Sequence, residues 1–98
     1  MRKTDKKLER DIVRELTAVC EAAKLTCSGF EWLTHTVDYA KFPESLRVTL
    51  VFDEMVNEKT MLAEFKALIS QVQFALEPIV DGELPAAQIE ARREHSIN

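Results

Sequence analysis

Residues 5–25 have the spacing of apolar side chains that an amphipathic helix requires. The apolar positions recur every three or four residues, which places them on one side of a helix; they are Leu8, Ile12, Leu16, Val19 and Ala23. Thr4 or Asp5 can cap the start of this helix by accepting a backbone N–H bond. Gly29 can adopt the left-handed conformation that ends a helix or opens a turn.

Residues 58–77 predict a second amphipathic helix with the same spacing. Its apolar stripe consists of Leu62, Phe65, Ile69, Val72 and Leu76, widened by Met61 and Leu68. We expect Asn57 to cap the start, because its side-chain oxygen can accept the first free N–H groups. Pro78 is expected to end the helix, since proline cannot continue the hydrogen-bond ladder.

Two shorter stretches predict β-strands joined as a hairpin. Residues 30–38 are rich in aromatic and β-branched residues, which strands favour. Residues 46–53 alternate more clearly, and one face carries only apolar side chains, namely Leu46, Val48, Leu50 and Phe52. Residues 39–45 are too many for a two-residue turn, so we expect an antiparallel hairpin with a wide loop around Pro43.

Residues 84–95 fit either a helix that starts at Pro85 or a third strand. A two-stranded hairpin is marginal alone, and two amphipathic helices need a broader sheet to cover. We therefore predict a strand, with one face formed by Ile89, Ala91, Arg93 and His95. The fold class that follows is α+β, a single domain over residues 1–98. It is a two-layer α/β sandwich in the order α-β-β-α-β, with both helices on one face of a small antiparallel or mixed sheet.

The sheet face opposite the helices is expected to be uncovered. It would carry Arg47, Thr49 and Val51 from the second strand. Beside them would lie one of two sets from the first strand: either Glu31, Leu33, His35 and Val37, or Phe30, Trp32, Thr34 and Thr36. Either set leaves several large apolar groups on this face, and uncovered apolar surface often forms an interface. The candidate interface residues are Trp32, His35, Tyr39, Phe42 and Arg47, since Trp, Tyr and Arg dominate interface hot spots.

Charge is distributed unevenly along the 98 residues, whose formal net charge is −4. Residues 1–14 hold six basic groups against three acidic ones; the basic groups are Arg2, Lys3, Lys6, Lys7, Arg10 and Arg14. Such a segment is either a basic patch for an acidic partner or a solvated helix face with i,i+4 charge pairs. The rest of the chain is acidic, which disfavours binding to nucleic acid phosphates.

The sequence indicates a cytoplasmic protein with no membrane partner. No run of 18 apolar residues occurs, and the basic start leads into a mixed amphipathic stretch rather than the apolar core of a signal peptide. Cys20 and Cys27 are too few and too close for a disulfide framework, so both are expected to be reduced thiols.

No motif indicates catalysis, a cofactor or a metal. Gly29 and Gly82 stand alone, so no phosphate-binding glycine loop exists. Cys27, His35 and His95 do not have the paired spacing of a zinc site. A nucleophilic pair would need Cys20 or Cys27 beside a histidine held by a third group. The adjacent carboxylates Asp53 and Glu54 precede a helix and suit capping better than acid–base chemistry. We therefore expect a binding protein with no cofactor, and not an enzyme.

The order α-β-β-α-β can be compared with the second type of KH domain, which clamps RNA with a GxxG loop between two helices. No GxxG loop occurs in this sequence. Nucleic acid is kept as the alternative partner because the first predicted helix is basic and could bind it. The main expectation is a binding or regulatory module that acts through contacts with another protein or with itself as a homodimer.

Several short segments also resemble one family. They are residues 1–7, 29–35, 42–43, 45–46 and 51–53, together with Tyr39. Over roughly residues 1–55 the chain is similar to small gammaproteobacterial proteins that are sometimes labelled "Fis family transcriptional regulator". Fis proteins read DNA with a C-terminal helix-turn-helix. Residues 54–98 predict one long helix, a proline and a short tail in its place, so no functional residue is carried over from this resemblance.

Overall fold

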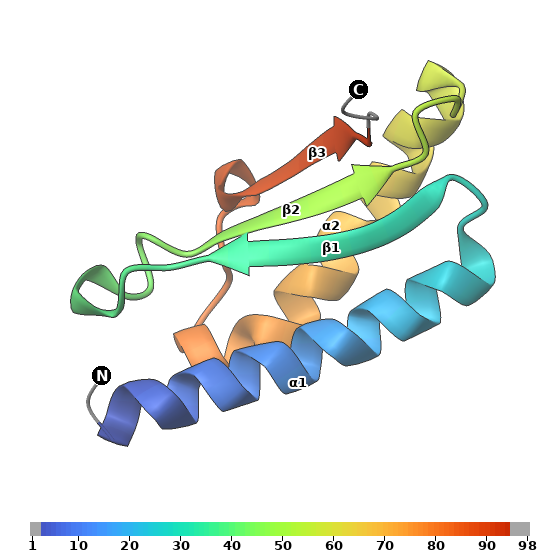
Figure 1. Cartoon of the computed structure of the whole chain (residues 1–98). Helices are drawn as coiled ribbons and strands as arrows, with labels where there is room; N and C mark the ends of the chain where they lie inside the picture. Colours follow the sequence, from blue (N-terminus) through green and yellow to red (C-terminus); the bar gives the residue numbers. More distant parts are fainter. Residues whose placement is uncertain (1–2, 95–98) are drawn as a thin grey trace, which may run out of the picture.

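A computed structural model describes residues 3–94 and confirms the predicted α+β fold. Figure 1 shows its elements in the order α1 (Lys3–Thr26), β1 (Phe30–Thr36), β2 (Arg47–Phe52), α2 (Glu58–Val80) and β3 (Ile89–Arg93). Two short 3-10 turns, Tyr39–Lys41 and Ala86–Gln88, lie before β2 and β3.

The three strands form one mixed sheet with β2 in the centre. β1 and β2 pair antiparallel as the predicted hairpin, whereas β3 returns parallel to β2 after the long α2 crossover. Both helices lie on one side of this sheet and pack against each other, with α2 behind the strands in Figure 1 and α1 along the β1 side. The predicted third strand is confirmed, although His95 lies outside the described residues.

The core fills the space between this sheet and the helices. The inward face of β2 behaves as predicted, since Leu46, Val48, Leu50 and Phe52 are fully buried. The predicted stripe of α1 is also confirmed, because four of its five members are buried and Leu8 is half-buried. Stability therefore depends on apolar burial between two layers, as in most small domains.

The predicted stripe of α2 is largely confirmed and is wrong at one member. Val72 and Leu76 are fully buried, and Phe65 and Ile69 pack against the core, but Leu62 is 53% exposed. Leu68, which we expected only to widen the stripe, is fully buried. Packing against α1 and the sheet therefore shifts the buried face away from Leu62 and toward Leu68.

A β-bulge in β1 decides which of its side chains face the helices. The pairing with β2 shifts register between Phe30 and Trp32. Such an extra residue changes the alternation of faces along a strand. Phe30 is consequently buried beside Phe52, with ring centroids 5.9 Å apart in an edge-to-face arrangement. Leu33 is partly buried against the core, and Trp32 points to the other face.

The helix ends differ from the predictions in two places. α1 begins at Lys3, so Thr4 and Asp5 lie in its first turn rather than at the cap. A carboxylate is stabilised there by the helix dipole and needs no capping geometry. Pro78 does not end α2, which continues to Val80.

The last turn of α2 tolerates proline because only one N–H group is lost and the helix ends two residues later, at Val80. The end is set by Asp81, which adopts the left-handed conformation with φ 58° and ψ 56°. The backbone N–H groups of Asp81 and Gly82 both donate to the carbonyl of Glu77. At the other end the predicted cap is confirmed, because Asn57 Oδ1 accepts from the N–H groups of Lys59 and Thr60.

A glycine is needed at position 29 because the backbone there lies close to the Val56 side chain, and not because the backbone is left-handed. Among residues 3–94 only Asp81 and Gly82 have a positive φ, so our expectation for Gly29 is wrong. Its N–H donates to Glu64 Oε1 of α2 over 3.1 Å, and a Cβ atom at this position would overlap the Val56 side chain. The start of β1 and the start of α2 therefore meet at a residue without a side chain.

Substitution Gly29→Ala should lower the free energy of unfolding by about 1–3 kcal/mol, because the added methyl overpacks against Val56. Chemical denaturation of the single and double variants measures this effect. The added cost of Gly29→Ala should shrink in a chain that also carries Val56→Ala, since that change removes the overlapping methyl groups. An equal cost in both backgrounds would show that the contact with Val56 is not the cause.

Candidate functional site

The uncovered sheet face is mainly polar, which corrects our expectation of several large apolar groups. Alternation and strand register place three rows across it: Trp32, Val51 and Arg92; Thr34, Thr49 and Glu90; and Thr36 with Arg47. Trp32 is 43% exposed, but Val51 in the same row is only 2% exposed. The bulge turns Phe30 inward, and the neighbouring side chains cover Val51, so Trp32 remains the single large apolar group exposed on this face within residues 3–94.

Hydrogen bonds within the chain occupy part of this face. Trp32 Nε1 donates to Glu94 Oε2 over 3.3 Å, and Thr49 Oγ1 donates to Glu90 Oε1 over 2.9 Å. Arginine and carboxylate side chains alternate with threonines, so little apolar surface would be gained by covering the face. The open sheet face is therefore a weaker candidate interface than the sequence indicated.

The five candidate interface residues do not form one surface. Trp32 and Arg47 are exposed on the open sheet face, whereas His35 lies on the opposite face, in a hollow between β1 and α1. Tyr39 and Phe42 are half-buried and pack against the core from the loop before β2. The Tyr39 hydroxyl is buried with no hydrogen-bond partner within residues 3–94, and burial raises its pKa, with the Glu9 and Asp5 charges adding to the effect.

Burial lowers the pKa of His35, and the nearby Glu9 charge opposes this only in part. The folded state therefore binds a proton at His35 less readily than the unfolded chain, whose histidine titrates near about pH 6.5. Below about pH 6.5 the unfolded state holds more protons at this position, so the contribution of His35 to stability falls as the pH falls.

The substitution His35→Gln should make the protein less sensitive to acid. The wild type should lose more stability than the variant between about pH 7.5 and pH 5, because only the wild type has this imidazole to protonate. Denaturation curves over this range measure the difference, and His95 is present in both proteins as an internal control. Parallel loss of stability in both chains would rule out the role assigned to His35.

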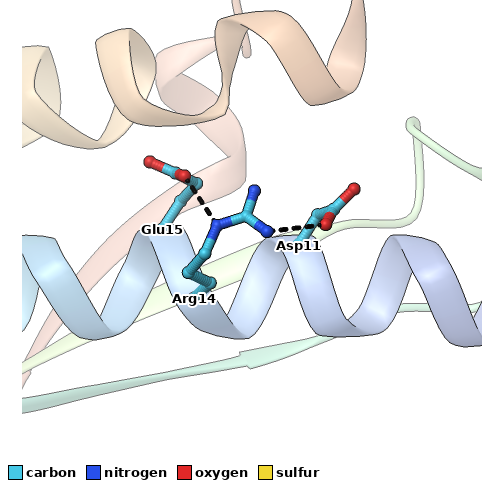
Figure 2. Close-up of polar contacts among 3 residues, drawn as sticks. All are labelled: Asp11, Arg14 and Glu15. Carbon is cyan, nitrogen blue, oxygen red and sulfur yellow. Dashed lines mark hydrogen bonds and ion pairs between the residues drawn. The ribbon is translucent and has the colours of Figure 1, made fainter.

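The basic patch is only partly available. Lys6, Lys7 and Arg10 are exposed in the first turns of α1, whereas Arg2 lies outside the described residues. Figure 2 shows Arg14 held between two carboxylates: its Nε lies 3.1 Å from Glu15 Oε2, and its NH1 atom 2.9 Å from Asp11 Oδ1. The hydrogen bond to Glu15 is the main cause that raises the pKa of Arg14, and the hydrogen bond to Asp11 adds to it. Its charge is thus neutralised locally, and Lys3 simply begins the helix.

No catalytic or metal-binding arrangement is formed by the described part of the chain. Cys20 is half-buried and Cys27 buried, and both are unpaired thiols, as predicted. Cys20 and His35 line the same hollow between α1 and β1, but no hydrogen bond joins them within residues 3–94. No group of three His, Cys, Asp or Glu side chains in this range could hold a metal ion.

A further exposed apolar surface lies where the two helices meet. Phe74, in the C-terminal half of α2, is 82% exposed. It borders a groove of about 500 Å³ between α1 and α2, whose lining consists of Glu15, Ala18, Val19, Ala22, Ser70, Gln71, Phe74 and Ala75. This groove follows the line along which the two helices meet, since its lining includes the buried core residue Val19 and also Ala75, which packs against the core.

Uncharged residues extend along both helices from this groove. We refer to eight of these exposed residues as the outer helical patch. They are Ala18, Ala22 and Leu25 of α1, and Ala63, Ala67, Ser70, Gln71 and Phe74 of α2. This surface was not predicted from the sequence. The available signal was a second stripe with helical spacing on each helix, but the alanines in it did not indicate an exposed face because alanine is more often buried.

Comparisons with known proteins gave no match to a family model, a curated protein or a solved structure. Within residues 3–94 neither helix combines the length and the apolar composition that crossing a lipid bilayer requires. The function must therefore be argued from the surfaces alone.

Proposed function

We propose that this protein is a protein-interaction module that acts through the outer helical patch. The observation that carries the proposal is Phe74, a large aromatic side chain that is 82% exposed on a helix whose core face is already satisfied by other residues. A phenylalanine in water gains nothing for the isolated fold, whereas its burial against a partner stabilises a complex through the hydrophobic effect.

The composition of the outer helical patch supports this proposal. Charged residues make up 31% of the chain, whereas the eight residues that line the groove include a single charged one, Glu15. Depletion of charge beside an exposed aromatic residue is the composition found in the cores of protein interfaces.

Affinity capture from the producing cell tests this function. Phe74→Glu should abolish the captured proteins, because a carboxylate cannot enter an apolar contact without losing its hydration. Leu62→Glu is the matched control: it makes the same kind of change on the same helix, about 120° away around the axis. Equal capture by the wild type and by Phe74→Glu would refute the proposed surface.

A role in nucleic-acid binding is the alternative, and the exposed group of Lys6, Lys7 and Arg10 supports it. Such binding would weaken steeply with salt, because cations are released from the phosphates. Fluorescence titration with mixed RNA and DNA at low salt measures it. We expect no salt-dependent binding, since the described chain has no GxxG loop and α2 runs unbroken from Glu58 to Val80.

We also propose that the protein works in the cytoplasm, in keeping with its two unpaired thiols, Cys20 and Cys27. The similarity to small gammaproteobacterial proteins remains a prediction and contributes nothing to the surface argument.

A further inference from the structure

We infer that the partner of the outer helical patch is a second copy of this chain, and that Phe74 of each copy enters the groove between α1 and α2 of the other. This inference rests on the proposed function and adds the identity of the partner. It assigns the contact to a two-fold symmetric dimer.

The outer helical patch has both a projecting side chain and, beside it, a groove that can receive one. Phe74 projects from α2, and the groove beside it has a volume of about 500 Å³ and a lining that includes the small side chains of Ala18 and Ala22. A two-fold axis along the helices places the projection of each copy over the groove of the other. Such an isologous arrangement uses one surface twice and therefore closes at two copies.

The local distribution of charge permits contact at this surface. Two molecules with a net charge of −4 repel each other, and this repulsion is weakest where the facing residues are uncharged. The outer helical patch provides that surface. The one carboxylate that lines the groove, Glu15, is already bound to Arg14, as Figure 2 shows.

The size of the helical face suits a stable dimer. The two helices, of 24 and 23 residues, pack against each other and diverge toward the start of α2 (Figure 1). Each is about 35 Å long and two packed helices are about 20 Å wide, so the face that they form together has an upper limit on the order of 700 Å². Stable interfaces bury about 800 Å² per partner. The uncharged patch would form the centre of this face.

Native mass spectrometry and light scattering on the purified full chain test the inference with two variants. Phe74→Glu removes the projection, and Ala22→Arg fills the groove. The wild type should have twice the monomer mass of 11.2 kDa, and each variant alone should dissociate with a dissociation constant raised about 30-fold or more. Leu62→Glu should remain a dimer. Circular dichroism verifies folding, which both exposed positions should preserve.

A mixture of the two variants gives the decisive result. In a mixed dimer, Phe74 of the Ala22→Arg copy still finds an open groove in the other copy. The second contact brings the introduced carboxylate of one copy near the introduced guanidinium of the other, and these opposite charges attract. The mixture should therefore form a heterodimer although neither variant pairs with itself.

Three results would overturn the inference: a wild type that stays monomeric at its highest soluble concentration, a dimer that persists in Phe74→Glu, or a mixture that remains monomeric. A monomeric wild type whose cellular capture still depends on Phe74 would leave the proposed function intact and remove only the second copy as the partner.

Discussion

Phe52→Ala should lower the free energy of unfolding by about 3–5 kcal/mol, the largest effect expected in this protein. Phe52 is fully buried on the central strand β2 and meets the ring of Phe30 edge-to-face. Truncation removes the buried ring and leaves a cavity that the paired strands on either side cannot close. Domains of this size have a total stability of about 5–15 kcal/mol, so the variant should lose a large share of the total.

Urea denaturation followed by circular dichroism measures the effect of Phe52→Ala. Phe52→Leu serves as the control, because it keeps most of the buried volume and should cost much less. A loss below about 1 kcal/mol for the alanine variant would contradict the central place of Phe52 in the core.

The second largest effect is expected in α2, where Leu68→Ala should cost about 2–5 kcal/mol and Leu62→Ala less than about 1 kcal/mol. Both changes remove the same atoms from the same helix. They differ in burial, since Leu68 is fully buried and Leu62 is 53% exposed. Thermal or chemical denaturation of the two variants gives the comparison directly.

This pair of variants also tests the rotational phase of α2. The sequence pattern placed Leu62 in the buried stripe, whereas the structure places Leu68 at its centre. Equal costs for both variants, or a larger cost for Leu62→Ala, would mean that α2 packs with a different face toward the sheet.

The parts of the fold that the sequence predicted are those with one dominant pattern. β2 has a single apolar face, and α1 has a single apolar stripe, so both could be oriented by periodicity. The third strand was predicted by a different argument, namely that two amphipathic helices need more sheet than a hairpin provides. Each of these predictions depends on a pattern or a packing requirement that few arrangements of the chain can satisfy.

The wrong predictions arise where local patterns allow more than one solution. Along β1 both faces mix apolar and polar residues, and the bulge after Phe30 moves that ring to the helix side. No single-strand pattern reveals a bulge, because the extra residue is defined by pairing with β2. Similarly, Pro78 was expected to end α2, but the helix end depends on the left-handed Asp81 and its bonds to Glu77.

The interface proposed from the structure differs from the one predicted from the sequence for the same reason. The sequence drew attention to aromatic residues near the hairpin, but burial separated His35, Tyr39 and Phe42 from Trp32. Phe74 lay outside the predicted apolar stripe, and no role was assigned to it from the sequence. The structure shows that its side chain is 82% exposed.

The central claim is that this protein makes its contacts through the outer helical patch, first of all with a second copy. A dilution series of amide and indole NMR spectra tests it most directly, because each residue reports its own surroundings. Chemical shifts of Ala18, Ala22, Ser70 and Phe74 should change on dilution, while the indole N–H signal of Trp32 on the open sheet face stays constant. Changes at Trp32 with a constant helical face, or no change anywhere, would contradict the account.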